Sequence, residues 1–519
     1  MPSIPARLTC LFACLAAAGA ATRAAERPNI LFIFTDDHTT QAISAYGSRI
    51  NRTPNLDRIA AEGVRFDNCF VGNSICGPSR ATVLTGKYSH ANGVFHNRNK
   101  LNPDQPLVTR MLQAAGYQTA IIGKWHLQID PPGFDHSEIL IDQGPYFNPP
   151  MIRNGQKVQH TGYTTTVITD LALKWLQSER DAGKPFFLMF QHKTPHRPWD
   201  PAPEYFDLYE NETIAEPPFL LEDISRRAAP VRQSDMLIAE TLDERDLNLI
   251  PPPEMNAEQL AKWKAAFEPR NARFREAMLT GDALTRWKYQ RFIKNYLRCV
   301  AALDDNIGRM LKYLDESGLA KNTVVIYVSD QGMWLGEHGW FDKRWMYEHS
   351  LRTPLIIRWP GVAQPGAFCD AIVSNLDFAA TFLDLAAAPP VPEMHGRSLV
   401  PLLKGESPAD WRKSFYYHYY EYPAWHYVRK HYGVTDTRFK LIHFYEKDVD
   451  QWELYDLKFD PYELSNLFEN ANYAAVRSRL ETELRGWRDR LAVPAVDPPL
   501  SEMGDFPPRT RTRWGVRPR

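Results

Sequence analysis

The residues Cys76-Gly77-Pro78-Ser79-Arg80 place a thiol, a proline and a guanidinium in one short stretch. Pro78 fixes its own φ and has no backbone donor, so it suits the first turn of a helix. A thiol at Cys76 would then lie at a helix N-terminus, where unpaired N–H groups and the helix dipole favour negative charge. Most free cysteines are instead small buried hydrophobic residues, so other parts of the chain must distinguish the two readings.

Two polar pairs, Asp36-Asp37 and Asp330-Gln331, each come directly after an apolar run. Adjacent carboxylates repel each other unless a cation lies between them. Oxygen ligands of this kind suit Ca²⁺ or Mg²⁺ and not a soft metal. A single Asp-Asp pair is usually a solvated turn, but two such pairs after two buried strands favour a metal site.

Basic side chains provide the opposite charge. A divalent cation with several fixed positive charges stabilises an oxyanion whose charge grows in the transition state. The candidate basic residues are Arg80, Lys124, His126, His196 and Lys343.

Four apolar runs must position these side chains: residues 28–34, 119–123, 185–190 and 323–328. Unbroken β-branched and aromatic runs of this length predict strands buried on both faces, as in a parallel sheet covered by helices. Ligands bind beyond the carboxyl ends of such strands, and each run is followed there by acids, lysines or histidines.

Helical patterns alternate with the strands, which predicts an α/β domain with a central sheet. The patterns cover residues 55–62, 107–115, 162–177 and 286–317. Gly63 and Gly116 are expected to end the first two helices as C-caps. A polar, proline-containing insertion occupies residues 198–280, with a helix expected over 256–267.

The C-terminal part changes character after residue 405. Residues 412–442 and 452–456 are rich in aromatic and alternating residues, which predicts antiparallel strands. The expected organisation is a catalytic domain over 26–405, an α+β subdomain over 406–497, and a proline- and arginine-rich flexible tail over 498–519.

The N-terminal segment 1–25 predicts a cleaved secretory signal, because Arg7 precedes an apolar run and small residues follow. The run is short for a membrane anchor. We therefore expect a secreted or periplasmic protein, with the bacterial surface as an alternative, and no stable membrane insertion. The net charge of −1 gives no sign of a nucleic-acid partner. The four cysteines outside the signal are too sparse for a disulfide framework.

Several of these motifs, in this order, resemble the type I sulfatases. Residues 76–80 resemble the family's C-x-P-x-R signature, and Gly123-Lys124-Trp125-His126 resembles its second signature. Residues 28–37, 195–198 and 336–354 extend the likeness, which covers residues 28–467. The likeness is strongest to bacterial N-acetylglucosamine-6-sulfatases. It implies an alkaline-phosphatase-like fold with a smaller C-terminal antiparallel sheet.

The resemblance also implies a nucleophile and a metal. A maturation enzyme would oxidise Cys76 to formylglycine, whose hydrate attacks sulfur. Arg80 would hold that hydrate. One Ca²⁺ would be bound by residue 76 together with Asp36, Asp37, Asp330 and Gln331. Many family members carry Asn in place of Gln331, so the longer arm of Gln331 must be accommodated.

The same resemblance assigns the acid–base groups. Lys124 and Lys343 would grip the sulfate oxygens. His196, with Lys343, would protonate the leaving alcohol, and His126 would take the proton that lets sulfate depart. His349 stands where the likeness leads us to expect an acid.

The expected substrate is a sulfated carbohydrate, with exo-acting removal of a 6-O-sulfate from N-acetylglucosamine or a related sugar of glycosaminoglycans or mucins. His192, His426 and His431, and also His418, are the candidate substrate contacts. His192 is either support for His196 or a satisfied polar residue at a strand end. The alternatives are a phosphodiesterase or phosphonate monoester hydrolase of the same superfamily, and a degenerate carbohydrate-binding protein.

Overall fold

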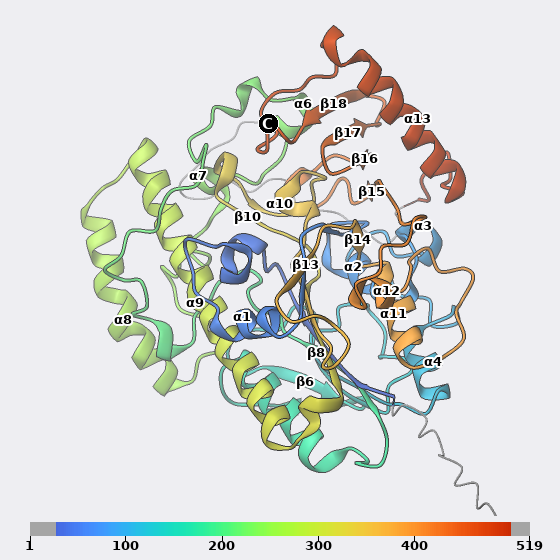
Figure 1. The fold of residues 1–519 in the computed structure, drawn as a ribbon. Coiled ribbons are helices and arrows are strands. Elements are labelled where there is room, and N and C mark those ends of the chain that lie inside the picture. The colour runs from blue at the N-terminus through green and yellow to red at the C-terminus, as the bar shows by residue number, and fades with distance from the viewer. Residues whose placement is uncertain (1–26, 500–519) are drawn as a thin grey trace, which may run out of the picture.

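The computed structural model describes residues 27–499, so the predicted signal (1–25) and nearly all of the predicted tail (498–519) lie outside the described residues. Within 27–499 the chain forms a ten-stranded sheet flanked by helices and a separate four-stranded sheet (Figure 1). The predicted fold class is confirmed, because the central strands of the large sheet are parallel and the smaller sheet is antiparallel.

The large sheet places the four predicted strands side by side at its centre. Five neighbouring strands, β9, β1, β8, β4 and β5, run parallel, and the strands outside them are partly antiparallel. In sheet order the strands are β13 (Ala367–Cys369), β2 (Val64–Phe66), β12 (Leu355–Arg358), β9 (Thr323–Ser329), β1 (Asn29–Thr35), β8 (Phe186–Gln191), β4 (Gln118–Gly123), β5 (His136–Leu140), β6 (Pro150–Arg153) and β7 (Gln156–Gln159).

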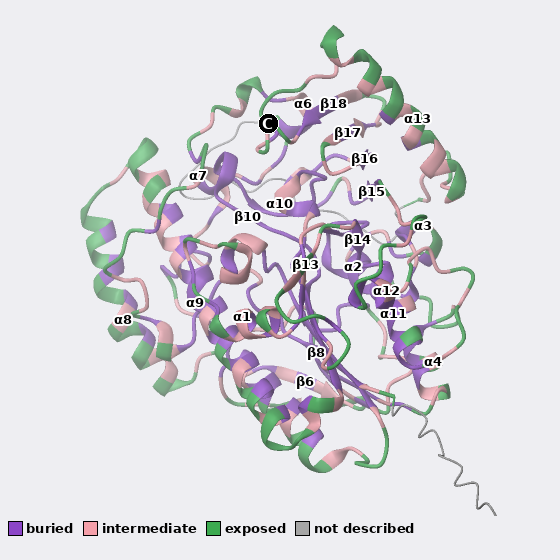
Figure 2. Cartoon of the chain, viewed as in Figure 1, coloured by how far each residue is buried: buried purple, intermediate pink, exposed green. Residues whose placement is uncertain are grey.

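Strand β1 shows why the runs are apolar without interruption. Alternate side chains point to opposite faces of a strand: Phe32 and Phe34 pack in one core, and Leu31 and Ile33 pack in the other. Figure 2 shows the central strands as buried. The first core is covered by α2 (Cys76–Thr85), α4 (Val108–Ala114), α11 (Asp377–Leu385) and α12 (Val400–Leu403). The second is covered by α1 (Pro54–Ala61), α5 (Thr164–Lys174) and α9 (Gly281–Glu316).

Two local predictions were wrong. Gly63 does not adopt the left-handed conformation of a C-cap. A Cβ there would lie 2.2 Å from the carbonyl oxygen of Ile357, so this glycine permits close packing against β12.

The helix predicted over 256–267 is longer than expected. This insertion helix, α8 (Ala257–Glu276), continues past Pro269, because Phe267 and Phe274 on its buried side anchor it in the interior. That burial outweighs the backbone hydrogen bond lost at proline.

The aromatic C-terminal run forms the small sheet as predicted. Its strands are β15 (Phe415–Tyr419), β16 (His431–Thr435), β17 (Phe439–Phe444) and β18 (Gln451–Asp456), and α13 (Ala474–Arg490) packs on it (Figure 1). Short elements connect the parts: α3 (Ser89–Asn92), α6 (Ala229–Arg232), α7 (Ile238–Thr241), α10 (Glu348–Leu351), β3 (Cys69–Phe70) with β14 (Val373–Ser374), and β10 (Trp334–Leu335) with β11 (Phe341–Asp342). Over residues 27–499, every helix is too short or too polar to cross a membrane.

Candidate active site

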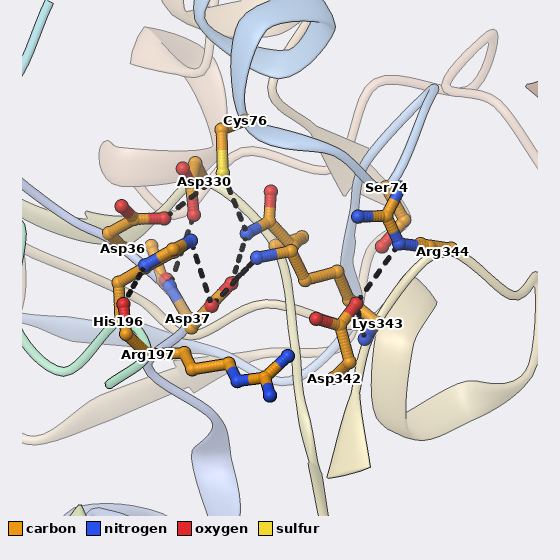
Figure 3. A network of polar contacts seen from close by, with 12 residues as sticks. Asp36, Asp37, Ser74, Cys76, His196, Arg197, Asp330, Asp342, Lys343 and Arg344 are labelled. Carbon is orange, nitrogen blue, oxygen red and sulfur yellow. Dashed lines mark hydrogen bonds and ion pairs between the residues drawn. The ribbon is translucent and has the colours of Figure 1, made fainter. Parts of the chain in front are cut away.

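The parallel strands bring the predicted site residues to one edge of the sheet. Because β9, β1, β8 and β4 are successive parallel neighbours, their carboxyl ends lie side by side. Asp330, Asp36, Gln191 and Lys124 stand at or directly after these ends, in that order across the sheet. Helix α2 adds Cys76, so segments from five parts of the chain meet here. Figure 3 shows Cys76 beside Asp36 and Asp330.

Cys76 is the first residue of α2 and is fully buried. Its Sγ donates to Oδ1 of Asp36 at 3.2 Å. Burial raises the pKa of the Cys76 thiol well above its usual value, and the charge of Asp36 raises it further. These effects outweigh the helix N-terminus that favours a thiolate. The side chain is therefore a neutral thiol, a poor nucleophile as it stands.

The carboxylates of Asp36, Asp37 and Asp330 form a buried cluster, with one oxygen of each lying within 4.8 Å of the others. Burial and the neighbouring carboxylates raise the pKa of Asp37 to about 6 and that of Asp330 to about 8. Burial alone would raise the pKa of Asp36 too, but Lys124 and other cations hold it well below its usual range.

Gln331 completes this oxygen-rich cluster. Its Nε2 donates to Oδ1 of Asp37 at 2.6 Å, while its buried Oε1 has no hydrogen-bond partner among the described residues. Three carboxylates around an amide whose oxygen is unpaired fit a hard divalent cation. Asp36, Asp37, Asp330 and Gln331, four of the five predicted ligands, would hold it; the fifth, residue 76, lies beside Asp36.

Three cations surround these acids. Lys124 pairs with Asp36, Nζ of Lys343 lies 2.7 Å from a carboxylate oxygen of Asp37, and Nη2 of Arg80 donates to Asp330 at 3.0 Å. All six side chains are almost completely buried. Their formal charges cancel, so a divalent cation bound among them would give the site a net positive charge that suits an anionic ester.

The two predicted acid–base histidines also face the cluster. His196 donates through Nδ1 to the carbonyl of Arg197 at 2.6 Å, which leaves Nε2 directed at Asp37, 3.8 Å away (Figure 3). Nε2 of His126 lies 3.4 Å from Asp142. Burial lowers the pKa of His126 to about 4 and that of His196 well below its usual value, so both rings are neutral in the free protein.

Two neighbours of His126 were not predicted. Asp142 and Gln143 follow β5, and Gln143 contacts both Lys124 and Nε2 of His126. The β5 segment HSEIL is short and half polar, so it gives a weak strand signal. Its parallel pairing with β4 brings these residues to the site.

A second polar group adjoins Lys343, and of its members only His426 was a predicted site residue. Nη1 of Arg344 lies 3.3 Å from Glu421 and its Nε 3.1 Å from Asp342. Nε2 of His426 pairs with Asp342 at 3.3 Å. Figure 3 shows Asp342, Lys343 and Arg344 following one another beside the carboxylate cluster. His426 therefore belongs to a polar group next to the site.

The other candidate histidines lie in the interior. His431 is fully buried; its Nδ1 donates to the carbonyl of Arg429 at 2.8 Å and its Nε2 accepts from the N–H of Met346 at 3.0 Å. The structure therefore does not support a sugar contact by His431. His418 is likewise held by two tyrosine hydroxyls.

His192 and His349 are also packed residues. His192 is buried against Phe190, and neither ring nitrogen has a hydrogen-bond partner in the described part of the chain. Its ring nitrogens are therefore not satisfied by hydrogen bonds in this part of the chain, and no hydrogen bond joins it to His196, so its predicted role in the site stays a prediction. His349 stacks on Trp334, with ring centroids 4.5 Å apart.

Comparison with known proteins gives a consistent result. The sulfatase family model matches residues 28–388, and the model of the C-terminal part of N-sulphoglucosamine sulphohydrolase matches residues 336–490. An N-acetylglucosamine-6-O-sulfatase of Bacteroides thetaiotaomicron is 47% identical over 504 residues, covering 92% of this chain and 90% of the relative.

Solved structures agree on the fold. BT4656, solved with its substrate D-glucosamine-2-N,6-O-disulfate, matches with a TM-score of 0.88 and 47% identity over 90% of this chain and 98% of that one. A phosphonate monoester hydrolase of Agrobacterium radiobacter shares the fold, with a TM-score of 0.67 and 22% identity over 90% of this chain and 96% of that one. Given a family model that spans most of its length and a relative of 47% identity, the chain belongs to the sulfatase family.

Proposed function

We propose that this protein hydrolyses the 6-O-sulfate ester of N-acetylglucosamine or a related amino sugar, acting on the terminal residue of a sulfated glycan. The buried cluster around Cys76 carries this proposal, because it collects three carboxylates, three cations and two histidines at one position. The names of the 47% identical relative and of the substrate bound in the matching structure support the choice of sugar.

Two further groups would complete the site: a modified residue and a metal ion. Formylglycine at position 76 would supply a hydrated aldehyde, with one hydroxyl to attack sulfur and a second that allows sulfate to leave. The neutral, buried thiol of Cys76 supports the need for this conversion. A calcium ion held by Asp36, Asp37, Asp330 and Gln331 would neutralise charge on the sulfate oxygens.

The lysines and Arg80 would bind and orient the anion. Lys124 and Lys343 approach the carboxylate cluster from two different strand ends. Arg80 is held by Gln191, the carbonyl of Lys124 and the ring of Phe34, so its guanidinium is fixed before substrate binds. Fixed charges in a buried site stabilise developing charge without reorganisation.

His196 and His126 are suited to opposite roles. The hydrogen bond from Nδ1 of His196 to Arg197 leaves Nε2 to hold a proton toward the leaving oxygen. An anionic ester beside it would raise the pKa of this ring and so favour the protonated form. His126, with a pKa of about 4, is neutral at pH 7 and can accept a proton, with Asp142 holding the ring.

The polar group of Asp342, Arg344, Glu421 and His426 would hold the sugar hydroxyls. It adjoins Lys343, and the indole of Trp425 beside His426 is 56% exposed, so it offers a face on which a sugar ring can pack. Buried hydrogen-bonding groups discriminate strongly, because an ill-fitting sugar leaves them unpaired.

The proposed setting is outside the cytoplasm. The N-terminal segment 1–25 would be removed on export to the periplasm or medium, and a formylglycine-generating enzyme would act on Cys76. N-terminal sequencing of protein from the native host tests the first point, since a chain that retained Met1 would contradict cleavage.

Turnover of matched esters tests the reaction and the sugar. We expect the highest kcat/KM for 6-O-sulfated N-acetylglucosamine, much less for a 2-O-sulfated uronic acid, and little for an aryl phosphate or phosphonate. Preference for the phosphorus esters would support the phosphonate or phosphodiester alternative instead. Preference for the uronic acid would overturn the sugar while leaving the sulfatase reaction intact. Binding of the sugar without turnover by formylglycine-bearing protein would indicate a degenerate carbohydrate-binding protein.

A further inference from the structure

A basic pocket of about 320 Å³ lies between the insertion and α9, the helix that follows it. Helix α8 and residue 210 supply its insertion side. Five cationic side chains line the pocket, with Glu210 as the lining acid. The cations are Arg270, Arg273, Arg291, Lys294 and Arg298.

Glu210 neutralises only part of this charge. One of its oxygens lies 3.1 Å from Nε of Arg270 and 3.8 Å from Arg273, and the other lies 3.0 Å from Arg298. Arg270 also pairs with Asp207, whose side chain is 88% exposed and therefore well screened. Three arginines thus share one partly buried carboxylate.

The other two cations are bound by neutral acceptors. Nη1 of Arg291 donates to Oδ1 of Asn271 at 2.9 Å and to the carbonyl of Leu247 at 3.3 Å. Nζ of Lys294 donates to the backbone carbonyl of Glu210 at 3.2 Å. Burial, with the charges of nearby arginines, lowers the pKa of Arg291 to about 9 and lowers that of Lys294 as well. The pocket therefore carries positive charge that the protein leaves uncompensated.

An apolar wall stands beside these cations. The rings of Phe274 and Trp287 stack with centroids 3.5 Å apart, and the guanidinium of Arg291 lies 5.1 Å from the centroid of Trp287. Guanidinium groups bind the oxygens of sulfo and phospho groups in fork geometry. A saccharide ring carrying such a group would place its apolar face on the aromatic wall.

The pocket is separate from the active site. On α9, Tyr296 donates its hydroxyl to the carbonyl of Asp37 at 2.8 Å, so this side of the helix faces the carboxylate cluster. Lys294 and Arg298 are each two residues from Tyr296, or about 200° around the helix. The cationic side of α9 therefore points away from the carboxylate cluster.

We propose that this pocket is a second anion site, which binds a sulfo group of a sulfated saccharide and so anchors the glycan away from the active site. The pocket's charge and shape support an oxyanion site by themselves. The choice of a sulfated saccharide rests on the proposed function.

Protection of Lys294 from acetylation, read by mass spectrometry, tests the site locally. The probe is a sulfated tetrasaccharide of glucosamine and uronic acid, with Cys76→Ala protein used so that the probe is not consumed. At a concentration about ten times Kd, labelling of Lys294 should slow about tenfold, because about a tenth of the sites remain free. Lys264, exposed on α8 and outside the pocket, serves as the internal control.

Arg291→Gln should raise Kd for the tetrasaccharide about tenfold, as expected for one lost charge-assisted hydrogen bond. At the same probe concentration about half of the sites are then free, so labelling of Lys294 should slow only about twofold. Arg275→Gln removes the same charge from an exposed position on α8 and should change nothing. Arg291→Gln and Arg275→Gln are also made as single variants that keep Cys76. Both single variants should hydrolyse small sulfate esters at the wild-type rate, which verifies that they fold. Failure of the tetrasaccharide to protect Lys294 would overturn the site and leave the Glu210 network as a purely structural one.

The chemical class is tested by further probes. The desulfated tetrasaccharide should give no protection, and inorganic phosphate or an oligonucleotide should protect more weakly. Equal or better protection by either of these would overturn the saccharide assignment. Because turnover of 6-O-sulfated N-acetylglucosamine is measured separately, loss of the proposed function and loss of this site give different results.

Discussion

Replacing His431 with alanine separates a structural role from a sugar contact. The ring is fully buried among Trp345, Tyr417 and Phe444, and its two nitrogens bond to the backbone of Arg429 and Met346. The substitution leaves a cavity and a buried Met346 N–H without an acceptor. Lost packing and one unsatisfied donor together cost about 4 kcal/mol of unfolding free energy at pH 7.5.

This cost should depend on pH. Burial lowers the pKa of His431 from 6.5 to about 4, although its bond to the carbonyl of Arg429 raises it slightly. Because the folded-state pKa is depressed, the neutral ring stabilises the fold above pH 6.5, and this contribution is lost as pH falls toward 4. At pH 5 the loss is about 2 kcal/mol, so the His431→Ala deficit should shrink to about 2 kcal/mol.

Urea denaturation of the wild type and of His431→Ala at pH 7.5 and 5.0 measures the difference in unfolding free energy at each pH. The other titrating groups are the same in the two proteins, so their contributions cancel. His443→Ala on the same sheet is the control and should cost less, because its ring partner Asp450 is 72% exposed. His431 also positions the backbone of Met346, which is three residues from Lys343. Any effect of His431→Ala on Lys343 should therefore lower turnover of a sulfated sugar and of an aryl sulfate to the same extent. Unchanged stability with a selective loss on the sugar would refute the structural role.

Three further outcomes are expected. Mass spectrometry of the peptide containing residue 76 should detect formylglycine, and Cys76→Ala should abolish turnover with little change in Tm; a purely unmodified thiol in an active preparation would disprove the aldehyde mechanism. Asp330→Ala should lower activity by orders of magnitude and weaken Ca²⁺ binding measured by calorimetry, whereas full activity after verified removal of all metal would exclude the metal site. Gly123→Ala should destabilise the fold by more than about 4 kcal/mol, because its Cβ would lie 1.7 Å from the carbonyl oxygen of Gln191 and φ there is +115°; a soluble, active variant with wild-type Tm would contradict the strand register between β4 and β8.

Local sequence was sufficient for the centre of the sheet. The runs that became β1, β4, β8 and β9 are apolar on both faces because both faces are covered, and this pattern is visible without a structure. Since parallel strands end at one edge, the pairing of acids and cations beyond these runs predicted the cluster around Cys76. The proline after Cys76 likewise predicted the start of α2.

Residues whose position depends on pairing between distant segments could not be predicted. Asp142 and Gln143 reach the site only because β5 pairs with β4, and the basic pocket exists only because the insertion packs on α9. His426 and His431 stand five residues apart in one aromatic run, yet one pairs with Asp342 beside the site and the other is sealed in the core. Sequence determined the chemistry available at each strand end, because burial on both faces is a local pattern. Tertiary structure decided which histidines and arginines face a ligand, because that depends on which surfaces pack together.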